Sequence, residues 1–352
     1  MELDSFTKKD SYTLSERFQG PLRAEGHTTG PFQVPCLDKI KVLFCCRCIE
    51  LTEIPLIANL EKLYCSRSTS ITSIPTLENL QKLLCIGCVE LKVIPPLNNL
   101  RILDCSCCPL ITEIPVLENL TELYCYECVH ILEIPLLENL RFLGCGYSAL
   151  KKIPLLENLQ YLYCNNCLSL TEIPSLKNLK TLHCIGCSVL SQIHTLENLR
   201  RLDCYNCPVL KTISSMENLV ELNCYECLSL TDIPCLKNIE VLNCSGCRCI
   251  TSIVLEKRPR EIYFHGCVWL TYISSEFADL NQQGCLCLEG SPDYDPSVMD
   301  RLIRLQTWYK KRYLWRRIEQ LVYSQTVLAL YYAPGRRGHW IAIKNHTQIF
   351  WT

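Results

Sequence analysis

Apolar residues recur along the chain with a period of twenty. An Ile-Pro step or its equivalent returns every 20 residues from Val34 to Ile253, with one interval of 19 between Ile134 and Ile153. One copy, residues 114–133, reads IPVLENLTELYCYECVHILE, with apolar residues and cysteines at the spacing L-x-x-L-x-C-x-x-C-x-x-I. Self-similarity at such a period is typical of a solenoid, in which each repeat forms one turn and buries its apolar side against its neighbours. The pattern predicts about twelve turns.

The same pattern predicts what each turn is made of. The L-x-x-L-x-C segment favours a short strand, and the strands of successive turns would form one parallel sheet on the concave face. Twenty residues leave little room for a helix on the other side, where proline favours extended, polyproline-like backbone. We therefore expect a repeat solenoid with an extended or irregular convex side.

The repeat resembles a known family. Its core is similar to the leucine-rich-repeat signature L-x-x-L-x-L-x-x-[N/C]-x-L, with cysteine at the third aliphatic position and at the Asn/Cys position. The I-P-x-L segment is similar to the L-P-x-L of bacterial effector repeats. Cysteine-rich 20-residue repeats followed by a short basic, aromatic tail resemble leucine-rich-repeat proteins of giant, mimivirus-like DNA viruses. Over residues 34 to about 273, the resemblance implies a leucine-rich-repeat arc that recognises a protein, with the host cytoplasm as its location.

The 28 cysteines need an explanation of their own. Nine turns contain C-x-x-C, and adjacent pairs are spaced as in a zinc ribbon. However, Phe264 replaces the first cysteine of the last turn, and Ser68 and Ser148 replace the second cysteine of two others, while the leucines persist. We therefore predict buried, reduced thiols whose S–H groups reach neighbouring backbone, and no metal site. Metal binding and redox chemistry are the alternatives.

An asparagine precedes each predicted strand and is expected to form a turn, because Asn bonds its own backbone and tolerates left-handed geometry. Ten turns have it: Asn59, Asn79, Asn99, Asn119, Asn139, Asn158, Asn178, Asn198, Asn218 and Asn238.

The repeat divides the chain into four segments. Residues 1–33 are predicted to be a flexible leader, 34–275 the solenoid, 276–296 a linker, and 297–352 a basic aromatic helix followed by a β-hairpin. The helix would begin at Asp295 and Pro296, as N-cap and first residue. Its basic residues are Lys310, Lys311, Arg312, Arg316 and Arg317. It could cap the last turn, bind an acidic partner, or contact nucleic acid or an anionic membrane.

Charge confines any binding of nucleic acid or membrane to that helix. The whole chain has a formal net charge of −1, whereas residues 300–352 carry ten Lys and Arg against two acidic residues. The first ten residues contain no apolar run that could be a signal peptide, and nowhere do about 20 uninterrupted apolar residues predict a membrane span. We expect a cytoplasmic protein.

Residues that vary on the concave face are the candidates for recognition. Nine of the 17 tyrosines lie on it, and tyrosine supplies a large, rigid contact area with a polar tip. Acidic residues join them from the fifth turn onward, whereas the earlier turns are basic. The predicted binding residues are Tyr64, Tyr124, Tyr126, Glu127, Tyr147, Tyr161, Tyr163, Tyr205, Tyr225 and Glu226. They would bind a basic or mixed-charge protein segment; the alternative is that tyrosine is there for its β-propensity alone.

The sequence contains no arrangement of residues that indicates catalysis. His183 and Asp203 are one turn apart, but no serine or cysteine nucleophile converges on them, and His183 is expected to be an ordinary surface residue. We predict a non-enzymatic protein-interaction scaffold with no catalytic residue, no cofactor, no metal and no small-molecule substrate, and an unidentified host protein as partner. The alternatives are the substrate-recognition adaptor of a ubiquitin ligase and a nucleic-acid or membrane contact through the basic helix.

Overall fold

The structure is a computed structural model that describes residues 11–13, 40–267, 270, 272–273 and 286–287. All of these belong to the first of two compact units, Met1–Ser291. The predicted helical cap, with Lys310, Lys311, Arg312, Arg316 and Arg317, lies outside the described residues, as do residues 34–39 at the start of the first repeat.

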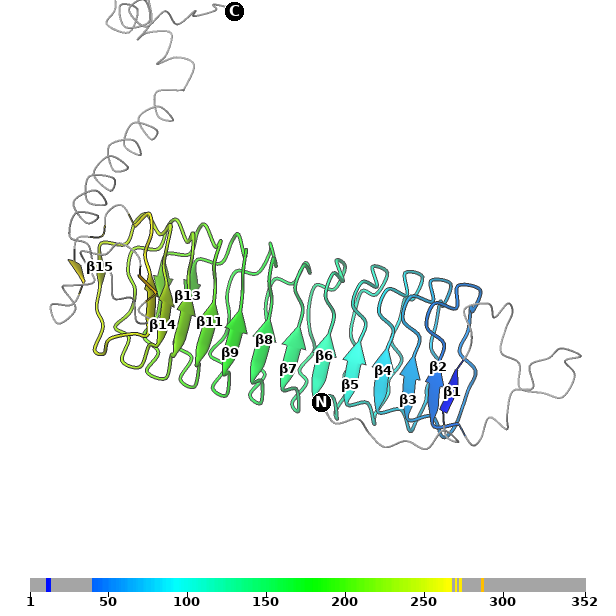
Figure 1. The fold of residues 1–352 in the computed structure, drawn as a ribbon. Coiled ribbons are helices and arrows are strands. Elements are labelled where there is room, and N and C mark those ends of the chain that lie inside the picture. The colour runs from blue at the N-terminus through cyan, green and yellow to red at the C-terminus, as the bar shows by residue number, and fades with distance from the viewer. Residues whose placement is uncertain (1–10, 14–39, 268–269, 271, 274–285, 288–352) are drawn as a thin grey trace, which may run out of the picture. The chain divides into compact units, whose positions relative to one another are not determined.

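One parallel strand comes from each turn of the repeat, and the strands lie side by side in a single row (Figure 1). The repeat contributes β2 (Val42–Phe44), β3 (Lys62–Tyr64), β4 (Lys82–Leu84), β5 (Ile102–Asp104), β6 (Glu122–Tyr124), β7 (Phe142–Gly144), β8 (Tyr161–Tyr163), β9 (Thr181–His183), β11 (Arg201–Asp203), β13 (Glu221–Asn223), β14 (Val241–Asn243) and β16 (Glu261–Tyr263). Twelve strands enclose eleven complete turns, which confirms the predicted repeat solenoid with its parallel sheet.

Each strand has only three residues because the side-chain pattern allows no more. Its middle residue, leucine or isoleucine, is buried, as is the cysteine that follows it, so the first and third residues face outward. The register is in phase throughout, with Leu123 paired to Leu143 and Leu143 to Leu162. The ladder continues past the strands, since the Cys125 N–H donates to the Gly144 carbonyl at 2.7 Å. Identical apolar positions therefore stack through the whole array.

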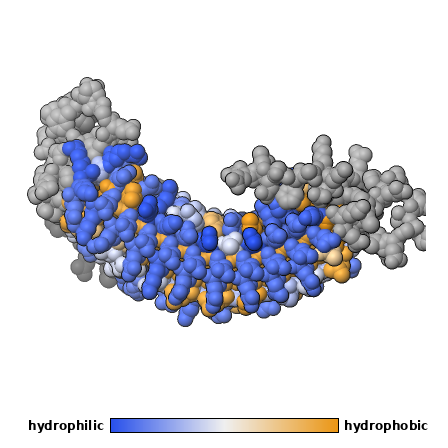
Figure 2. Space-filling model, turned by 90° about the horizontal axis from the view of Figure 1, so that it is seen from below, coloured by the Kyte–Doolittle hydropathy of each residue, from blue (hydrophilic) through white to orange (hydrophobic). Residues whose placement is uncertain are grey.

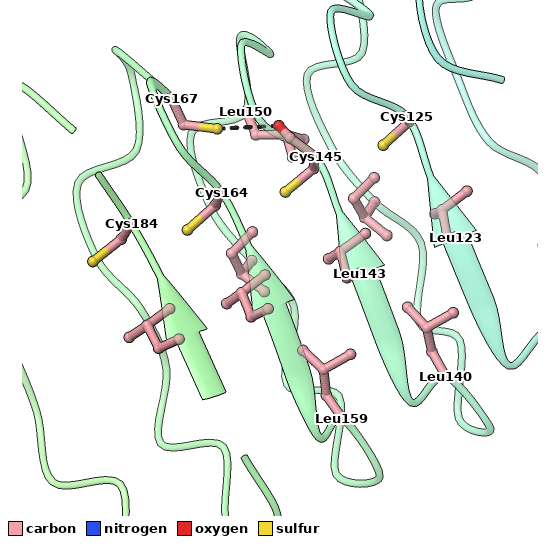
Figure 3. Packing of buried hydrophobic residues seen from close by; sticks show 14 of the residues in the cluster. Leu123, Cys125, Leu140, Leu143, Cys145, Leu150, Leu159, Cys164, Cys167 and Cys184 are labelled. Carbon is pink, nitrogen blue, oxygen red and sulfur yellow. Dashed lines mark hydrogen bonds between the residues drawn. The ribbon is translucent and has the colours of Figure 1, made fainter. Parts of the chain in front are cut away.

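From Cys88 onward, the second cysteine of the motif links one turn to the turn before it. The Cys128 thiol donates to the Cys105 carbonyl at 3.1 Å, and Cys167 donates to the Cys145 carbonyl at 3.2 Å (Figure 3). Seven more buried cysteines make the same bond at 2.9–3.1 Å: Cys88, Cys108, Cys187, Cys207, Cys227, Cys247 and Cys267. We call these nine bonds the thiol ladder. They confirm that the S–H groups reach neighbouring backbone.

The first cysteines form a parallel column inside the core. Burial raises the pKa of the Cys125 thiol well above its ordinary value, so this sulfur stays protonated. Where serine replaces the second cysteine, its hydroxyl still bonds a carbonyl: Ser68 donates to Cys45 of the preceding turn, and Ser148 donates to Cys145 of its own turn. No group of three His, Cys, Asp or Glu in the described part of the chain is arranged to hold a metal ion.

The asparagines form a second ladder, but not in the predicted way. The side-chain amide of Asn119 donates to the Asn98 carbonyl at 2.8 Å, and Asn139 donates to the Glu118 carbonyl at 2.9 Å. The predicted turn-forming role is confirmed, since Asn119 lies in a turn that is closed by the Leu120 N–H on the Leu117 carbonyl at 3.0 Å. The expectation that Asn bonds its own backbone in left-handed geometry was wrong, because the amide reaches the corner of the preceding turn instead. The left-handed backbone lies at another position, two residues after the first cysteine, with Tyr147 at φ 57°.

The opposite side of each turn is extended, as predicted. Short two-stranded pairings join β10 (Gln192–Ile193) to β12 (Thr212–Ile213) and β15 (Ser252–Ile253) to β17 (Tyr272–Ile273). Elsewhere isolated bridges join adjacent turns, such as that between Glu53 and Ser73. The row of turns curves, so that one side of the array is hollow (Figure 2).

Two strands outside the repeat extend the sheet. Within the predicted leader, β1 (Ser11–Thr13) pairs with β2 in parallel. Within the predicted linker, β18 (Leu286–Cys287) pairs with β16 in antiparallel fashion. Both therefore satisfy backbone groups of an end strand that no further repeat would pair. Among the described residues, no helix is long and apolar enough to cross a membrane.

The thiol ladder can be tested by removing one bond. The Cys105 carbonyl accepts only the Cys128 thiol among the described residues. Cys128→Ala should lower the free energy of unfolding by about 1–3 kcal/mol, through the unpaired carbonyl and the small cavity. Cys128→Ser should cost less, because Ser68 makes this bond at the equivalent position. Denaturant unfolding of the full chain under reducing conditions measures both. The control, Cys46→Ala at an exposed cysteine, should change it by no more than about 0.5 kcal/mol; equal losses from Cys128→Ala and Cys46→Ala would contradict the role of the bond.

Candidate binding surface on the strand face

Aromatic rings stack in a row across four neighbouring strands. The ring centroids of Tyr124 and Phe142 are 4.6 Å apart, those of Phe142 and Tyr163 are 5.1 Å apart, and those of Tyr163 and His183 are 4.4 Å apart. The planes of neighbouring rings are inclined by 15–31°, so each ring covers the face of the next. Tyr163 and His183 stack because they are in register on neighbouring strands, which lie about 4.8 Å apart. Phe142 contacts Tyr124 and Tyr163 diagonally, because the β7 residue in register with both is Gly144. The stack presents ring edges to solvent.

Two more tyrosines widen this row. Tyr126 lies 6.5 Å from Tyr124, and Tyr161 lies 6.3 Å from Phe142, both measured between ring centroids. Tyr161 keeps 38% of its surface exposed. We call Tyr124, Tyr126, Phe142, Tyr161 and Tyr163 the aromatic cluster. It occupies β6, β7 and β8 and the turn after β6, in the middle of the array (Figure 1).

Two glycines make room for Tyr126. A Cβ at Gly144 would overlap the Tyr126 ring, and one at Gly146 would lie 2.9 Å from the Asn165 carbonyl oxygen and 3.3 Å from that ring. The Tyr126 ring therefore lies over Gly144 and Gly146, two positions of the following turn that carry no side chain. Burial raises the pKa of the Tyr126 hydroxyl, and burial followed by the hydrogen bond to Glu122 raises that of Tyr124, so both stay protonated.

A polar network continues the row at its C-terminal end. The Nδ1 atom of His183 lies 3.2 Å from Oδ2 of Asp203, which also accepts the Nε–H of Arg201 at 3.1 Å. Arg201 also pairs with Glu221, at 3.1 Å. Asp203 is only 7% exposed, and these partners compensate for burying its charge.

Burial also controls the ionisation of His183. It lowers the pKa of the imidazole; Asp203 acts in the opposite direction, and Arg201 adds to the lowering. At neutral pH the imidazole is therefore neutral. Because a carboxylate can only accept, the proton lies on Nδ1, and Nε2 carries a lone pair.

The structure brings together only some of the predicted binding residues. Tyr124, Tyr126, Tyr161 and Tyr163 meet in the aromatic cluster. Tyr64 stacks instead on Phe44 at 4.6 Å, with the Lys82 ammonium 5.8 Å from its ring centroid. Tyr205 makes no ring contact among the described residues and is half-buried. The Tyr225 hydroxyl donates to Glu226 at 2.8 Å.

Three predicted residues lie in the left-handed turn rather than on a strand. Glu127, Tyr147 and Glu226 have φ of 56–58°, where four other turns have glycine. A side chain in this conformation costs about 1–2 kcal/mol. Tyr147 is nonetheless 56% exposed and packs into no core, so folding gives no reason for it.

Two central residues escaped the sequence analysis. Phe142 joins three of the tyrosines and occupies the same first strand position as the predicted Tyr161, but only tyrosines and acidic residues were selected there. The alternation of the strand was the signal, because residues two apart share a face. His183 was interpreted as an ordinary surface residue; its neighbours Tyr163 and Asp203, one turn away on each side, were the signal that it belongs to a row.

The charges on this face are largely satisfied internally. Glu122, Asp203, Glu221 and Glu226 all bond partners on the same face. Exposed basic residues also stand just before the strands of the middle turns, at Arg101, Arg141, Lys180 and Arg200. The strand-start edge, seen in Figure 2, is mostly hydrophilic. The face is therefore mixed in charge over its later turns.

These features define the class of the molecule as a parallel β-solenoid of leucine-rich turns with an aromatic strand face. Its structure is similar to that of a leucine-rich repeat protein from Bacteroides ovatus ATCC 8483, with 20% sequence identity, a TM-score of 0.43 and coverage of 65% of this chain and 74% of that chain. No protein-family model matches the sequence, and no curated protein matches it.

The fit of Tyr126 over Gly144 can be tested by a double-mutant cycle. Gly144→Ala should destabilise the full chain by about 1–3 kcal/mol, because its methyl group overlaps the Tyr126 ring. In the Tyr126→Ser background the overlap is gone, and the same substitution should be nearly neutral. The measurement is denaturant unfolding of the four proteins. Additive effects would show that the ring does not lie over Gly144.

Proposed function

We propose that this protein is a non-enzymatic recognition scaffold that binds a protein segment on the aromatic cluster. The supporting observation is the cluster itself: five aromatic side chains from β6, β7, β8 and the turn after β6 meet on the strand face, and Tyr161 is 38% exposed. Tyrosine and phenylalanine on a concave surface provide large contact area at little entropic cost. Residues that only built the sheet would not require Gly144 and Gly146 to make room for a ring.

The partner is proposed to be a protein with mixed charge. Acidic and basic groups both border the cluster, so neither sign dominates the surface around it. The resemblance to giant-virus repeat proteins implies a host protein in the cytoplasm, and this remains a prediction. The adaptor and nucleic-acid alternatives depend on residues 297–352, which lie outside the described residues.

The test is selection of ligands by the full chain. A phage-displayed library of random twelve-residue peptides is panned on the wild type, and the enriched peptides are synthesised. Tyr124→Ser combined with Tyr163→Ser should weaken their binding by about thirtyfold or more, because a single hot-spot residue contributes about 2 kcal/mol or more and the effects of neighbouring residues are not additive. Fluorescence anisotropy measures the affinity, and circular dichroism checks the fold.

The matched control removes an exposed apolar side chain from the opposite side of the turn. Leu136→Ser, at a residue 55% exposed beside an Ile-Pro step, should leave the affinity unchanged. Peptides that bind the tyrosine variant as tightly as the wild type would place recognition elsewhere and contradict the proposal.

A further inference from the structure

Tyr163 and His183 place a hydrogen-bond donor beside an acceptor at the outer ends of two stacked rings. The hydroxyl of tyrosine and the Nε2 of histidine are the atoms of these side chains farthest from the backbone or nearly so. With ring centroids 4.4 Å apart and planes inclined by 15°, the two outer ends lie side by side. Neither atom has a hydrogen-bond partner within the described part of the chain. The Tyr124 hydroxyl, by contrast, already donates to Glu122.

The surroundings of His183 fix which of its nitrogens accepts. The facing groups are Tyr163 from β8 and Asp203 and Arg201 from β11. Asp203 accepts a hydrogen bond from the Nδ1–H of His183 and is itself held by Arg201. The imidazole therefore cannot change its tautomer without breaking the contact with Asp203. The neutral imidazole therefore offers a lone pair at Nε2, next to the Tyr163 O–H.

This pair matches the main chain of an extended peptide. In an extended segment, the N–H and C=O of one residue point to the same side, which is how paired strands exchange two hydrogen bonds with one residue. A donor and an acceptor about one strand spacing apart can bond both groups at once. The adjoining rings of the aromatic cluster would then contact the neighbouring side chains of the peptide.

Single-stranded nucleic acid fits this surface less well. Such ligands are bound by stacking bases on exposed aromatic faces. Here the faces of Phe142, Tyr163 and His183 cover one another at 4.4–5.1 Å, and edges are presented instead. Asp203 and Glu221 would also repel phosphate at this end of the row.

We propose that the strand face binds an extended peptide and reads its main chain at one residue, whose carbonyl accepts the Tyr163 hydroxyl and whose N–H donates to His183 Nε2. This inference rests on the proposed function and goes further, because it names the conformation of the partner and two residues that orient it. In this proposal His183 contributes to recognition as a hydrogen-bond acceptor, and not through the area that its ring buries.

An N-methyl scan tests the main-chain contact. In a synthetic peptide selected on the full chain, each amide N–H is methylated in turn, and binding is measured by fluorescence anisotropy. One position should weaken binding to the wild type about threefold to tenfold, as expected for one hydrogen bond. His183→Phe keeps the ring stack but lacks the acceptor, so methylation at that position should have no further effect on it.

The dependence on pH provides a second readout. Only the neutral imidazole accepts, so binding should be constant near neutral pH and weaken as the pH falls through the lowered pKa of His183. His183→Gln, which keeps an acceptor that does not titrate, should bind without this loss at acid pH. The matched control is His130→Gln: His130 is exposed, contacts the Pro109 carbonyl through Nδ1, and lies off the strand face. It should retain the full pH dependence.

The outcomes separate this inference from the proposed function. If the tyrosine variant loses the peptide while His183→Phe shows the same N-methyl profile as the wild type, the main-chain contact is wrong and the binding surface stands. If no peptide is enriched on the wild type, both fail. Binding of a twelve-nucleotide oligothymidylate that requires Tyr163 would overturn the assignment to a peptide.

Discussion

The hydrogen bond from each second cysteine to the preceding turn is the contact on which the regularity of the array depends. Every repeat strand of the main sheet is three residues long, too short to hold its neighbours through its own ladder alone. Beyond the strand the chain bends toward the opposite side, and the carbonyl of the first cysteine is left inside the core, where an unpaired acceptor costs about 1–3 kcal/mol. Cys128 and its equivalents satisfy that carbonyl from the next turn.

Cysteine suits this position because it is both apolar and able to donate. Leucine or valine at position 128 would leave the Cys105 carbonyl unpaired, and a larger polar residue could not be packed. At Ser68 the serine hydroxyl replaces the thiol and donates to the Cys45 carbonyl of the preceding turn. Ser148 instead donates to the Cys145 carbonyl of its own turn, and Cys167 of the following turn donates to that same carbonyl. The nine cysteines of the thiol ladder, whose spacing from the first cysteines by itself indicates disulfides or zinc, are therefore explained by one backbone carbonyl that recurs from turn to turn.

Periodicity made most of the fold predictable, and the exceptions have physical causes. The strands, the buried leucines and the extended outer side all follow from the period of twenty. The left-handed turn after each strand was not foreseen, because Arg47, Cys107 and Tyr147 occupy a position that glycine usually marks. The asparagine amides were expected to bond locally, but only the stacking of turns reveals that the nearest free carbonyl belongs to the preceding corner.

The candidate surface was predictable in composition but not in arrangement. The tyrosines of three neighbouring columns could be identified from the sequence, and Tyr124, Tyr126, Tyr161 and Tyr163 do meet. Their meeting point depends on Phe142, which lies two residues before Gly144 on the same strand face, and on the absence of side chains at Gly144 and Gly146. The position of the Tyr126 ring thus depends on glycines in the following turn, and a comparison of equivalent positions one column at a time does not reveal this.

The turn of 19 residues shows where the chain tolerates a change of length. The missing residue falls between Ser148 and Leu150, yet Phe142 still pairs with Tyr161 and Leu143 with Leu162. Strand register is therefore independent of the length of the connection that follows the second cysteine position. Insertions at this edge, next to the aromatic rings, could add a loop over the strand face while leaving the sheet unchanged, so this scaffold can acquire new specificities by loop growth as well as by substitution.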